Sequence, residues 1–139
     1  MKPPILLLFQ TFYSWRRGRL KHPTYGLHEI NHQNATYSRV IPYLAPHFEI
    51  RMTDCSPIIG TRSSDKFPTD HTFVQSAVEQ RDWLGIISFG RQADEALDYL
   101  QVDHWPLPHP VSYQWRRDLI IETRDVFVAY AQEVHNAMA

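Results

Sequence analysis

The segment 86–97 constrains the fold of this chain more than any other part of the sequence. It begins with an apolar run that ends at Phe89, passes through Gly90, and continues with helical spacing. Such a strand–glycine–helix unit is typical of α/β proteins, in which the loop after a parallel strand presents side chains to a ligand. The chain then reaches His109, which stands between Pro108 and Pro110 and therefore in a stiff segment outside regular structure.

The remaining elements are expected to alternate. Apolar runs and helical spacing predict strands over 5–9, 48–53, 84–89 and 104–107, and helices over 34–45, 69–83, 91–100 and 118–137. Thr69 or Asp70 can cap the second helix, and Pro42 should kink or shorten the first. This order predicts a three-layer α/β/α fold with a short, mainly parallel four-stranded sheet.

Length and composition favour one domain over 1–139. A chain of 139 residues with 43% hydrophobic residues is long and apolar enough to bury a single core. The one cysteine, Cys55, rules out an internal disulfide and a four-cysteine cluster, so no iron–sulfur cluster is expected. The apolar run 5–9 is too short for a signal peptide or a membrane span. We therefore expect a cytoplasmic monomer with no membrane partner.

Basic and aromatic residues occur together in two places, although the net charge is only −1. This net charge argues against a polycationic nucleic-acid coat protein. The first place combines Arg16, Arg17, Arg19 and Lys21 with Tyr13, Trp15 and Tyr25, and the second combines Arg116 and Arg117 with Tyr113 and Trp115. Such clusters suit phosphate contact and base stacking together. The alternative is a set of ordinary solvated arginines.

The loops expected at the carboxyl ends of the strands hold most of the unusual residues. These loops are 10–30, 54–68, 90–91 and 108–117. In open parallel sheets ligands bind beyond the carboxyl ends of the strands, so we expect a site there.

Four short motifs in these loops or at their boundaries resemble the uracil-DNA glycosylase superfamily. They are Gln10-Thr11-Phe12-Tyr13, Thr53-Asp54, Gly90-Arg91-Gln92-Ala93 and His109-Pro110-Val111-Ser112. The family has corresponding motifs in a water-activating loop, a Thr-Asn pair, a Gly-x-x-Ala turn and a His-Pro-Ser loop. This chain departs from it in two positions that matter chemically. Thr11 stands where many relatives have an acid, and Asp54 stands where the family has an asparagine.

The resemblance implies a monofunctional DNA glycosylase that flips a pyrimidine out of double-stranded DNA, with no cofactor and no metal. His109 would stabilise the departing base through its O2 atom, and Gln10 and Thr11 would position water. Phe12, Tyr13 and Tyr25 are candidates for contact with the base. Tyr113 and Trp115 are candidate wedge residues. The remaining DNA contacts are expected from Arg16, Arg17, Arg91, Arg116 and Arg117.

Asp54 bears on the choice of base. A carboxylate only accepts hydrogen bonds, so it repels O4 of uracil and can accept from the amine of cytosine. Because excision of ordinary cytosine would destroy the host genome, this favours a modified cytosine, hydroxymethylated or glucosylated as in phage DNA. Some members of the superfamily resemble antiphage glycosylases of this kind. A turn-capping role for Asp54 is the structural alternative.

Three other functions are left open by the sequence. One is uracil excision in base-excision repair, and another is a non-catalytic DNA- or base-binding module, which the missing acid would explain. The third rests on His28-Glu29-Ile30-Asn31-His32, which matches the H-E-x-x-H motif of zinc proteases. In that case His47 or Glu49 would be the third ligand. The polar flanks of this motif are unlike a zinc-protease helix.

Overall fold

The computed structural model describes residues 1–11, 18–29, 35–62 and 64–138. Its centre is a five-stranded sheet with the order β3-β4-β1-β6-β7. The strands are β1 Pro4–Phe9, β3 Tyr25–Gly26, β4 Glu49–Asp54, β6 Gly85–Phe89 and β7 Trp105–Leu107. A separate antiparallel pair joins β2 Gly18–Arg19 to β5 Ile58–Ile59.

Four strands of the main sheet are parallel, and their register is continuous across it. Leu8 of β1 lies beside Thr53 of β4 on one side and beside Ser88 of β6 on the other. On the far side of β6, Phe89 pairs with Leu107 of β7. The strands therefore end together, and the loops that follow them emerge at one edge.

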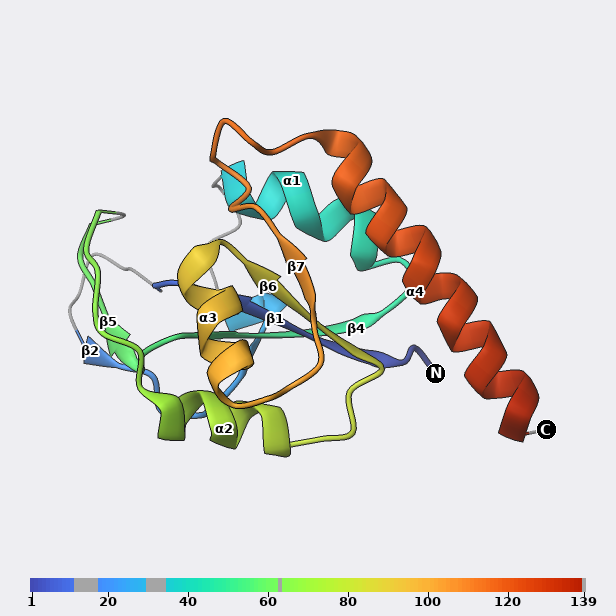
Figure 1. Cartoon of the computed structure of the whole chain (residues 1–139), viewed down its shortest axis with the longest axis horizontal. Coiled ribbons are helices and arrows are strands. Elements are labelled where there is room, and N and C mark those ends of the chain that lie inside the picture. The colour runs from blue at the N-terminus through green and yellow to red at the C-terminus, as the bar shows by residue number, and fades with distance from the viewer. Residues whose placement is uncertain (12–17, 30–34, 63, 139) are drawn as a thin grey trace.

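The helices cover both faces of the sheet, as Figure 1 shows. Helices α1 Ala35–Leu44 and α4 Arg117–Met138 contribute to one buried apolar cluster, and α2 His71–Glu79 and α3 Arg91–Tyr99 to another. Side chains along β1 alternate between the two faces and contribute to both clusters, since Leu7 belongs to the first and Leu8 to the second. The expected three-layer α/β/α arrangement is present.

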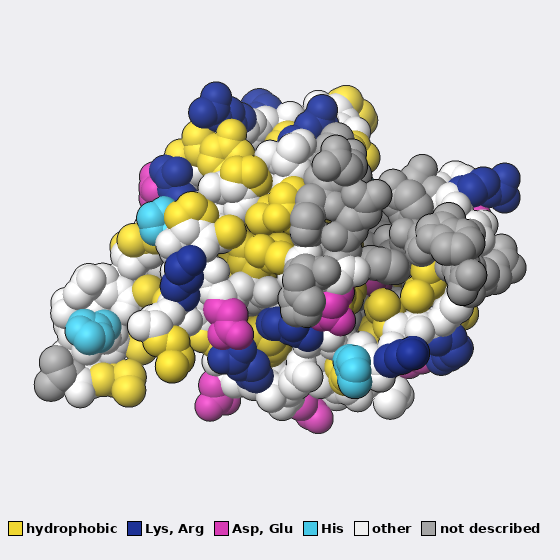
Figure 2. Space-filling view, turned by 180° about the vertical axis from the view of Figure 1, so that it is seen from behind, with side chains coloured by type: hydrophobic (Ala, Val, Ile, Leu, Met, Phe, Trp, Pro, Cys, Tyr) yellow, Lys and Arg dark blue, Asp and Glu magenta, His cyan; other side chains and the backbone are white. Residues whose placement is uncertain are grey.

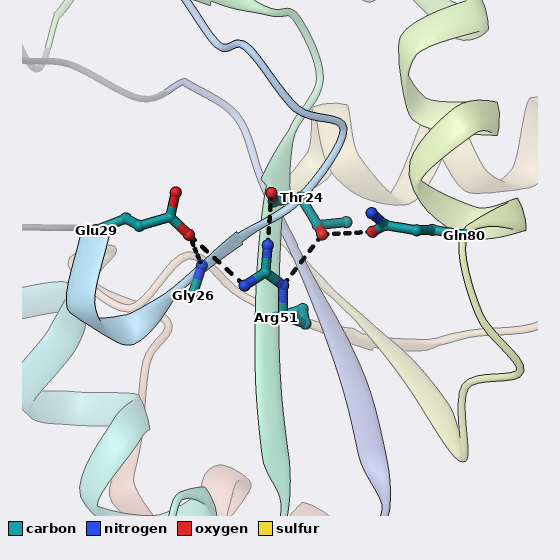
Figure 3. A network of polar contacts seen from close by, with 5 residues as sticks. All are labelled: Thr24, Gly26, Glu29, Arg51 and Gln80. Atoms are coloured by element: carbon teal, nitrogen blue, oxygen red, sulfur yellow. Dashed lines mark hydrogen bonds and ion pairs between the residues drawn. The ribbon is translucent and has the colours of Figure 1, made fainter.

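The sheet has five strands, and the expected number of four is wrong. The additional strand is β3, which pairs antiparallel with β4 through Tyr25 opposite Met52. A set of polar contacts fixes this segment on β4 (Figure 3). Arg51 of β4 donates to the hydroxyl and to the carbonyl oxygen of Thr24 at 3.1 and 2.7 Å, and the same hydroxyl donates to Gln80 after α2. The partners that hold β3 are distant from it in sequence, so its pairing cannot be read from neighbouring residues. The segment itself is polar, and its polarity predicts only a loop.

The other boundaries differ from the expected ones by a few residues at most, except in α2. Asp70 caps α2 by accepting from the Phe73 N–H at 3.0 Å, as the sequence predicts. The helix ends at Glu79 rather than at Trp83. Pro42 lies inside α1, which continues to Leu44 before it ends. None of the helices in the described part of the chain is long and apolar enough to cross a membrane.

Candidate functional site

The loops after β1, β6 and β7 bring Gln10, Gly90 and His109 together. A Cβ atom placed on Gly90 would lie 3.6 Å from the Cβ atom of His109 and 3.7 Å from Nε2 of Gln10. Gly90 has a φ of 91°, which favours glycine, and its N–H donates to the carbonyl of Leu107 at 2.9 Å. The strand order reverses between β1 and β6, because the chain leaves β1 toward β4 and later returns to β6 on the other side. Such a reversal is where open parallel sheets bind ligands.

The ring of His109 has a defined tautomer in its neutral form. The backbone N–H of Val111 donates to Nδ1 of His109 at 3.2 Å, so Nδ1 is an acceptor and the ring proton is on Nε2. Burial lowers the pKa of His109 from its ordinary value of 6.5. The imidazole is therefore neutral near pH 7, and its Nε2–H remains as a hydrogen-bond donor. The turn is closed by the Ser112 N–H, which donates to the carbonyl of His109 at 2.9 Å.

Asp54 ends β4 at the same edge of the sheet, but its side chain is enclosed. It is only 1% exposed, and the hydroxyl of Tyr25 donates to its two carboxylate oxygens at 3.3 and 3.1 Å. Burial raises the pKa of Asp54 to about 7, although the hydrogen bond from Tyr25 opposes this. Burial first, and then the neighbouring carboxylate, raises the pKa of Tyr25 well above 10.0. Tyr25 thus packs in the core and holds Asp54, instead of presenting its ring at the surface.

Asp54 and His109 are separated by the ends of β1 and β6, because Asp54 ends β4 and His109 follows β7. The Cys55 N–H donates to the carbonyls of Phe9 and Gln10 at 3.1 and 3.3 Å, which fixes the residue after Asp54 against the Gln10 loop. Gln10 therefore lies between the two residues. Its carbonyl accepts from the residue after Asp54, and its side chain approaches Gly90, next to His109. Thr11 follows it and is half-buried.

Two buried hydroxyls next to this edge were not anticipated from the sequence. Oγ1 of Thr53 and Oγ of Ser88 are buried and have no hydrogen-bond partner among the described residues. Both side chains flank Leu8 in the register of the sheet. Thr53 was noted only as part of the Thr53-Asp54 motif, and Ser88 does not stand out in the sequence, because serine and threonine are ordinary at the ends of strands.

The segment between His109 and α4 forms one wall of a pocket of about 470 Å³. α1 forms the other wall, and the described residues that line the pocket are Ser38, Arg39, Tyr43, Ser112, Tyr113, Trp115 and Arg117. Tyr113 is 96% exposed, whereas Trp115 is half-buried with its ring centroid 6.3 Å from that of Phe89. Trp115 is therefore anchored to the core. Arg39 was missed in the sequence because it comes from a helix far from this loop along the chain.

The other described arginines expected to contact DNA do not line this pocket. Arg116 lies outside this pocket and pairs with Asp118 at 3.6 Å. Arg91 is at the start of α3, where it pairs with Glu95 at 2.8 Å on an exposed surface. Four further candidate residues, Phe12, Tyr13, Arg16 and Arg17, lie outside the described residues. Figure 2 shows acidic and basic side chains alternating along the lower edge of one face, so charge there is mixed.

The zinc-protease motif is only partly described. Residues Leu27–Glu29 form a single 3-10 turn, and His32 lies outside the described residues. The carboxylate of Glu29 accepts from the Gly26 N–H at 2.6 Å and lies 3.6 Å from Arg51, as Figure 3 shows. Glu49, a candidate third ligand, pairs with Arg81 at 2.9 Å. Glu29 thus has a structural role in holding β3 against β4.

The described residues do contain one other group with metal-ligand chemistry, formed by Asp94, Asp98 and His104. Nδ1 of His104 lies 2.8 Å from the carbonyl of Val102, which can only accept, so Nδ1 carries a proton. Nε2 lies 2.6 Å from Asp94. Burial lowers the pKa of His104, but the hydrogen bond to Asp94 and other contacts outweigh this and raise it overall. A protonated imidazole satisfies both contacts, so this group is an ion pair that fastens α3 to the segment before β7.

Comparisons with protein-family models, with curated proteins and with solved structures each found no match.

Proposed function

We propose that this chain is a monofunctional DNA glycosylase that hydrolyses the N-glycosidic bond of a flipped pyrimidine, with a modified cytosine as its substrate. The observation that carries the proposal is the convergence of Gln10 and His109 on either side of Gly90, where the strand order reverses. This arrangement supplies a hydrogen-bond donor and a water-positioning amide at one point. Three of the four motifs that resemble the uracil-DNA glycosylase superfamily begin at Gln10, Gly90 and His109, which meet there, whereas Thr53-Asp54 ends β4.

His109 has the protonation state that the reaction requires. When the N-glycosidic bond breaks, its electron pair stays on the base, and negative charge develops on the pyrimidine O2. A neutral imidazole with its proton on Nε2 can donate a hydrogen bond to that oxygen. Because the pKa of His109 is lowered, this donor is already in place at neutral pH without a proton transfer.

Water addition is assigned to Gln10 and Thr11. Neither is a base, so the reaction must be dissociative, with a sugar cation that forms before water attacks C1′. The side-chain amide of Gln10 can hold that water next to His109. On attack at C1′ the water releases a proton to solvent, and the departing base anion takes up one proton from solvent, so the protons balance. Thr11 supplies a second polar group, because its hydroxyl can donate and accept.

The choice of base is assigned to Asp54. Contact with a base requires the Tyr25–Asp54 pair to open, because the carboxyl is enclosed in the structure described above. With a pKa of about 7, Asp54 exists in both protonation states near neutral pH. The ionised form accepts from the amine of cytosine, whereas the protonated form can also donate to O4 of uracil. The ionised form therefore favours cytosine-type bases, and uracil is the alternative substrate.

The test is a panel of duplexes that contain uracil, cytosine, hydroxymethylcytosine or glucosylated hydroxymethylcytosine, scored for alkali-labile abasic sites. We expect cleavage at a modified cytosine and none at ordinary cytosine. His109→Ala should lower the single-turnover rate by about 10²–10³-fold, which is typical for loss of one donor to a developing oxyanion. His47→Ala is the matched control, since His47 is exposed and precedes β4 at the opposite edge of the sheet.

The other outcomes are distinct. Cleavage of uracil alone would retain the glycosylase and replace the assigned base. DNA binding with no abasic site in any duplex would indicate a non-catalytic module, for which the absent acid at Thr11 is the specific support. Equal activity of His109→Ala and His47→Ala would refute the assigned role of His109.

A further inference from the structure

The pocket between α1 and the segment 110–117 has a lining that differs from the rest of the surface. It combines two arginines, Arg39 and Arg117, with the rings of Tyr43, Tyr113 and Trp115. Among the described residues that line it, none is a carboxylate. The two arginines also have no carboxylate partner in the described part of the chain, although most other arginines there are paired.

Both arginines are held in position by contacts that leave their charge uncompensated. Nη1 of Arg39 donates to the carbonyl of Pro110 at 2.6 Å. The guanidinium of Arg117 lies over the ring of Tyr43, 5.7 Å from its centroid. A guanidinium fixed by a carbonyl or by a ring keeps donors available, and its planar fork matches the oxygens of a phosphate.

The aromatic part of the pocket has one ring that is free to stack. Tyr113 is 96% exposed, and its neighbour Trp115 is anchored to the core through Phe89. An exposed ring beside two fixed cations is the combination by which proteins bind unstacked nucleotides. A volume of about 470 Å³ is within the range of pockets that take small organic ligands.

The pocket is built on the loop that carries His109. Ser112, which lines the pocket, donates its N–H to the carbonyl of His109, and Arg39 bonds the intervening Pro110. A strand whose reacting nucleotide is at His109 therefore passes the mouth of this pocket. This adjacency favours a nucleotide of that strand over a free nucleotide.

We propose that this pocket binds one unstacked nucleotide of the DNA strand, next to the nucleotide that reacts. This inference rests on the proposed function, because that function supplies the strand. Arg39 and Arg117 contact the phosphate, and Tyr113 stacks on the base. Tyr113 is then a platform for a neighbouring base and not a wedge in the duplex. Arg39 links the two sites, since the loop that it holds is the loop of His109.

The test measures binding of a labelled short single-stranded oligonucleotide by fluorescence anisotropy over a series of salt concentrations. Arg117→Gln should weaken binding and reduce the slope of log affinity against log salt by about 0.7, the value for one phosphate contact on a single strand. Tyr113→Ala should weaken binding about tenfold with no change in slope, because stacking releases no counterion. Arg117→Lys should restore the slope. Both side chains are exposed, and thermal unfolding will verify that the variants fold.

Arg81→Gln is the matched control. Arg81 also lies 5.7 Å from the centroid of an aromatic ring, that of Trp83, but it pairs with Glu49 and precedes β6 at the opposite edge of the sheet. This variant should bind like the unmodified protein. An equal loss of affinity in Arg81→Gln would show that only overall charge matters, and the proposal would be wrong.

Two further arms identify the source of the nucleotide. A deoxynucleoside monophosphate and inorganic phosphate are each used as competitors, and both should displace the oligonucleotide only weakly. Displacement by the mononucleotide at the affinity of the oligonucleotide would overturn the strand assignment in favour of a free nucleotide. Binding is scored without cleavage, so the pocket can be confirmed even where no abasic site forms. Conversely, if Arg117→Gln and Tyr113→Ala both keep full glycosylase activity and bind the oligonucleotide like the parent, the nucleotide pocket is rejected and the proposed glycosylase function is not.

Discussion

At the scale of single residues, the pair of Tyr25 and Asp54 is the most unusual feature of the core. A carboxyl that is 1% exposed has one hydroxyl as its hydrogen-bond donor and no cation beside it in the described part of the chain. Its pKa is raised to about 7 because burial disfavours the charged form. The folded state thus binds this proton more tightly than the unfolded state does, which links stability to pH.

The sign of this linkage gives a prediction for Asp54→Asn. The contribution of Asp54 is most favourable below its ordinary pKa of 3.8 and is lost as pH rises to about 7. A shift of about three pH units corresponds to roughly 4 kcal/mol. Because asparagine does not ionise, the variant should gain stability relative to the parent by roughly 2–3 kcal/mol between pH 5 and pH 8. Urea denaturation at both pH values measures this difference.

The control for this measurement is Asp103→Asn, which changes an exposed carboxyl. The stability difference between this variant and the parent should be the same at both pH values. If Asp54→Asn behaves in the same way, then Asp54 is ionised and stabilised in the folded protein, and our interpretation of the Tyr25–Asp54 pair is wrong.

At the scale of elements, the packing of α4 on the sheet depends on one glycine. A Cβ atom on Gly85, at the start of β6, would lie 2.6 Å from Cε2 of Phe127. Phe127 is also in edge-to-face contact with Phe48 and Trp105, so its ring has little freedom to move away. The absence of a side chain at position 85 is what allows α4 to approach β6 so closely.

Gly85→Ala should therefore destabilise the protein by about 1–3 kcal/mol, as overpacking of a core usually does. In the background of Phe127→Leu, which removes the clashing atoms, the same change should be harmless or favourable, since alanine suits a strand better than glycine. A double-mutant cycle measured by denaturant unfolding gives the coupling, which we expect to exceed about 1 kcal/mol. Additive effects would show that Phe127 has room to adjust, contrary to the geometry.

Elements were predictable from the sequence where local spacing specifies them. The strands that end at Phe9 and Phe89 follow from continuous apolar runs, and the cap at Asp70 follows from its residue type. Trp83 was assigned to α2 because its apolar spacing continues that of the helix. The chain in fact turns at Gln80, and the indole N–H of Trp83 donates back to the carbonyl of Val78. Helical spacing therefore identified a core contact and misplaced the end of the helix.

In the candidate site, too, some positions could be predicted from the sequence and others could not. Gln10, Gly90 and His109 could be brought together from the sequence, because parallel strands end at one edge. The enclosure of Asp54 could not, since it depends on Tyr25 from a segment that looks like a loop and that β4 holds through Arg51. Arg39 was missed for a related reason, because only the folded chain places it beside Pro110.

At the scale of the whole molecule, the sheet separates two apolar clusters that share no residue. Leu44 of α1 is fully buried in one cluster, and Leu97 of α3 is fully buried in the other. The register of β1 connects them, because its alternate side chains enter opposite clusters. The two faces of the sheet therefore contact different helices but share the backbone of the same strands. This predicts how the stability effects of two side-chain truncations, one on each face, add together.

Leu44→Ala and Leu97→Ala should each destabilise the protein by about 2–5 kcal/mol, the usual range for a buried leucine. Because the two side chains lie in different clusters, the effects should add to within about 0.5 kcal/mol in the double variant. Unfolding should remain a single transition when it is followed both by tryptophan fluorescence and by far-ultraviolet circular dichroism, since loss of either layer exposes the same sheet. The circular dichroism reports α1, α2, α3 and α4 together, whereas the fluorescence includes Trp105 on the α4 side and Trp83 on the α2 side. Two separate transitions would mean that one helical layer can detach while the sheet survives, in which case the edge that carries Gln10 and His109 would not depend on both layers.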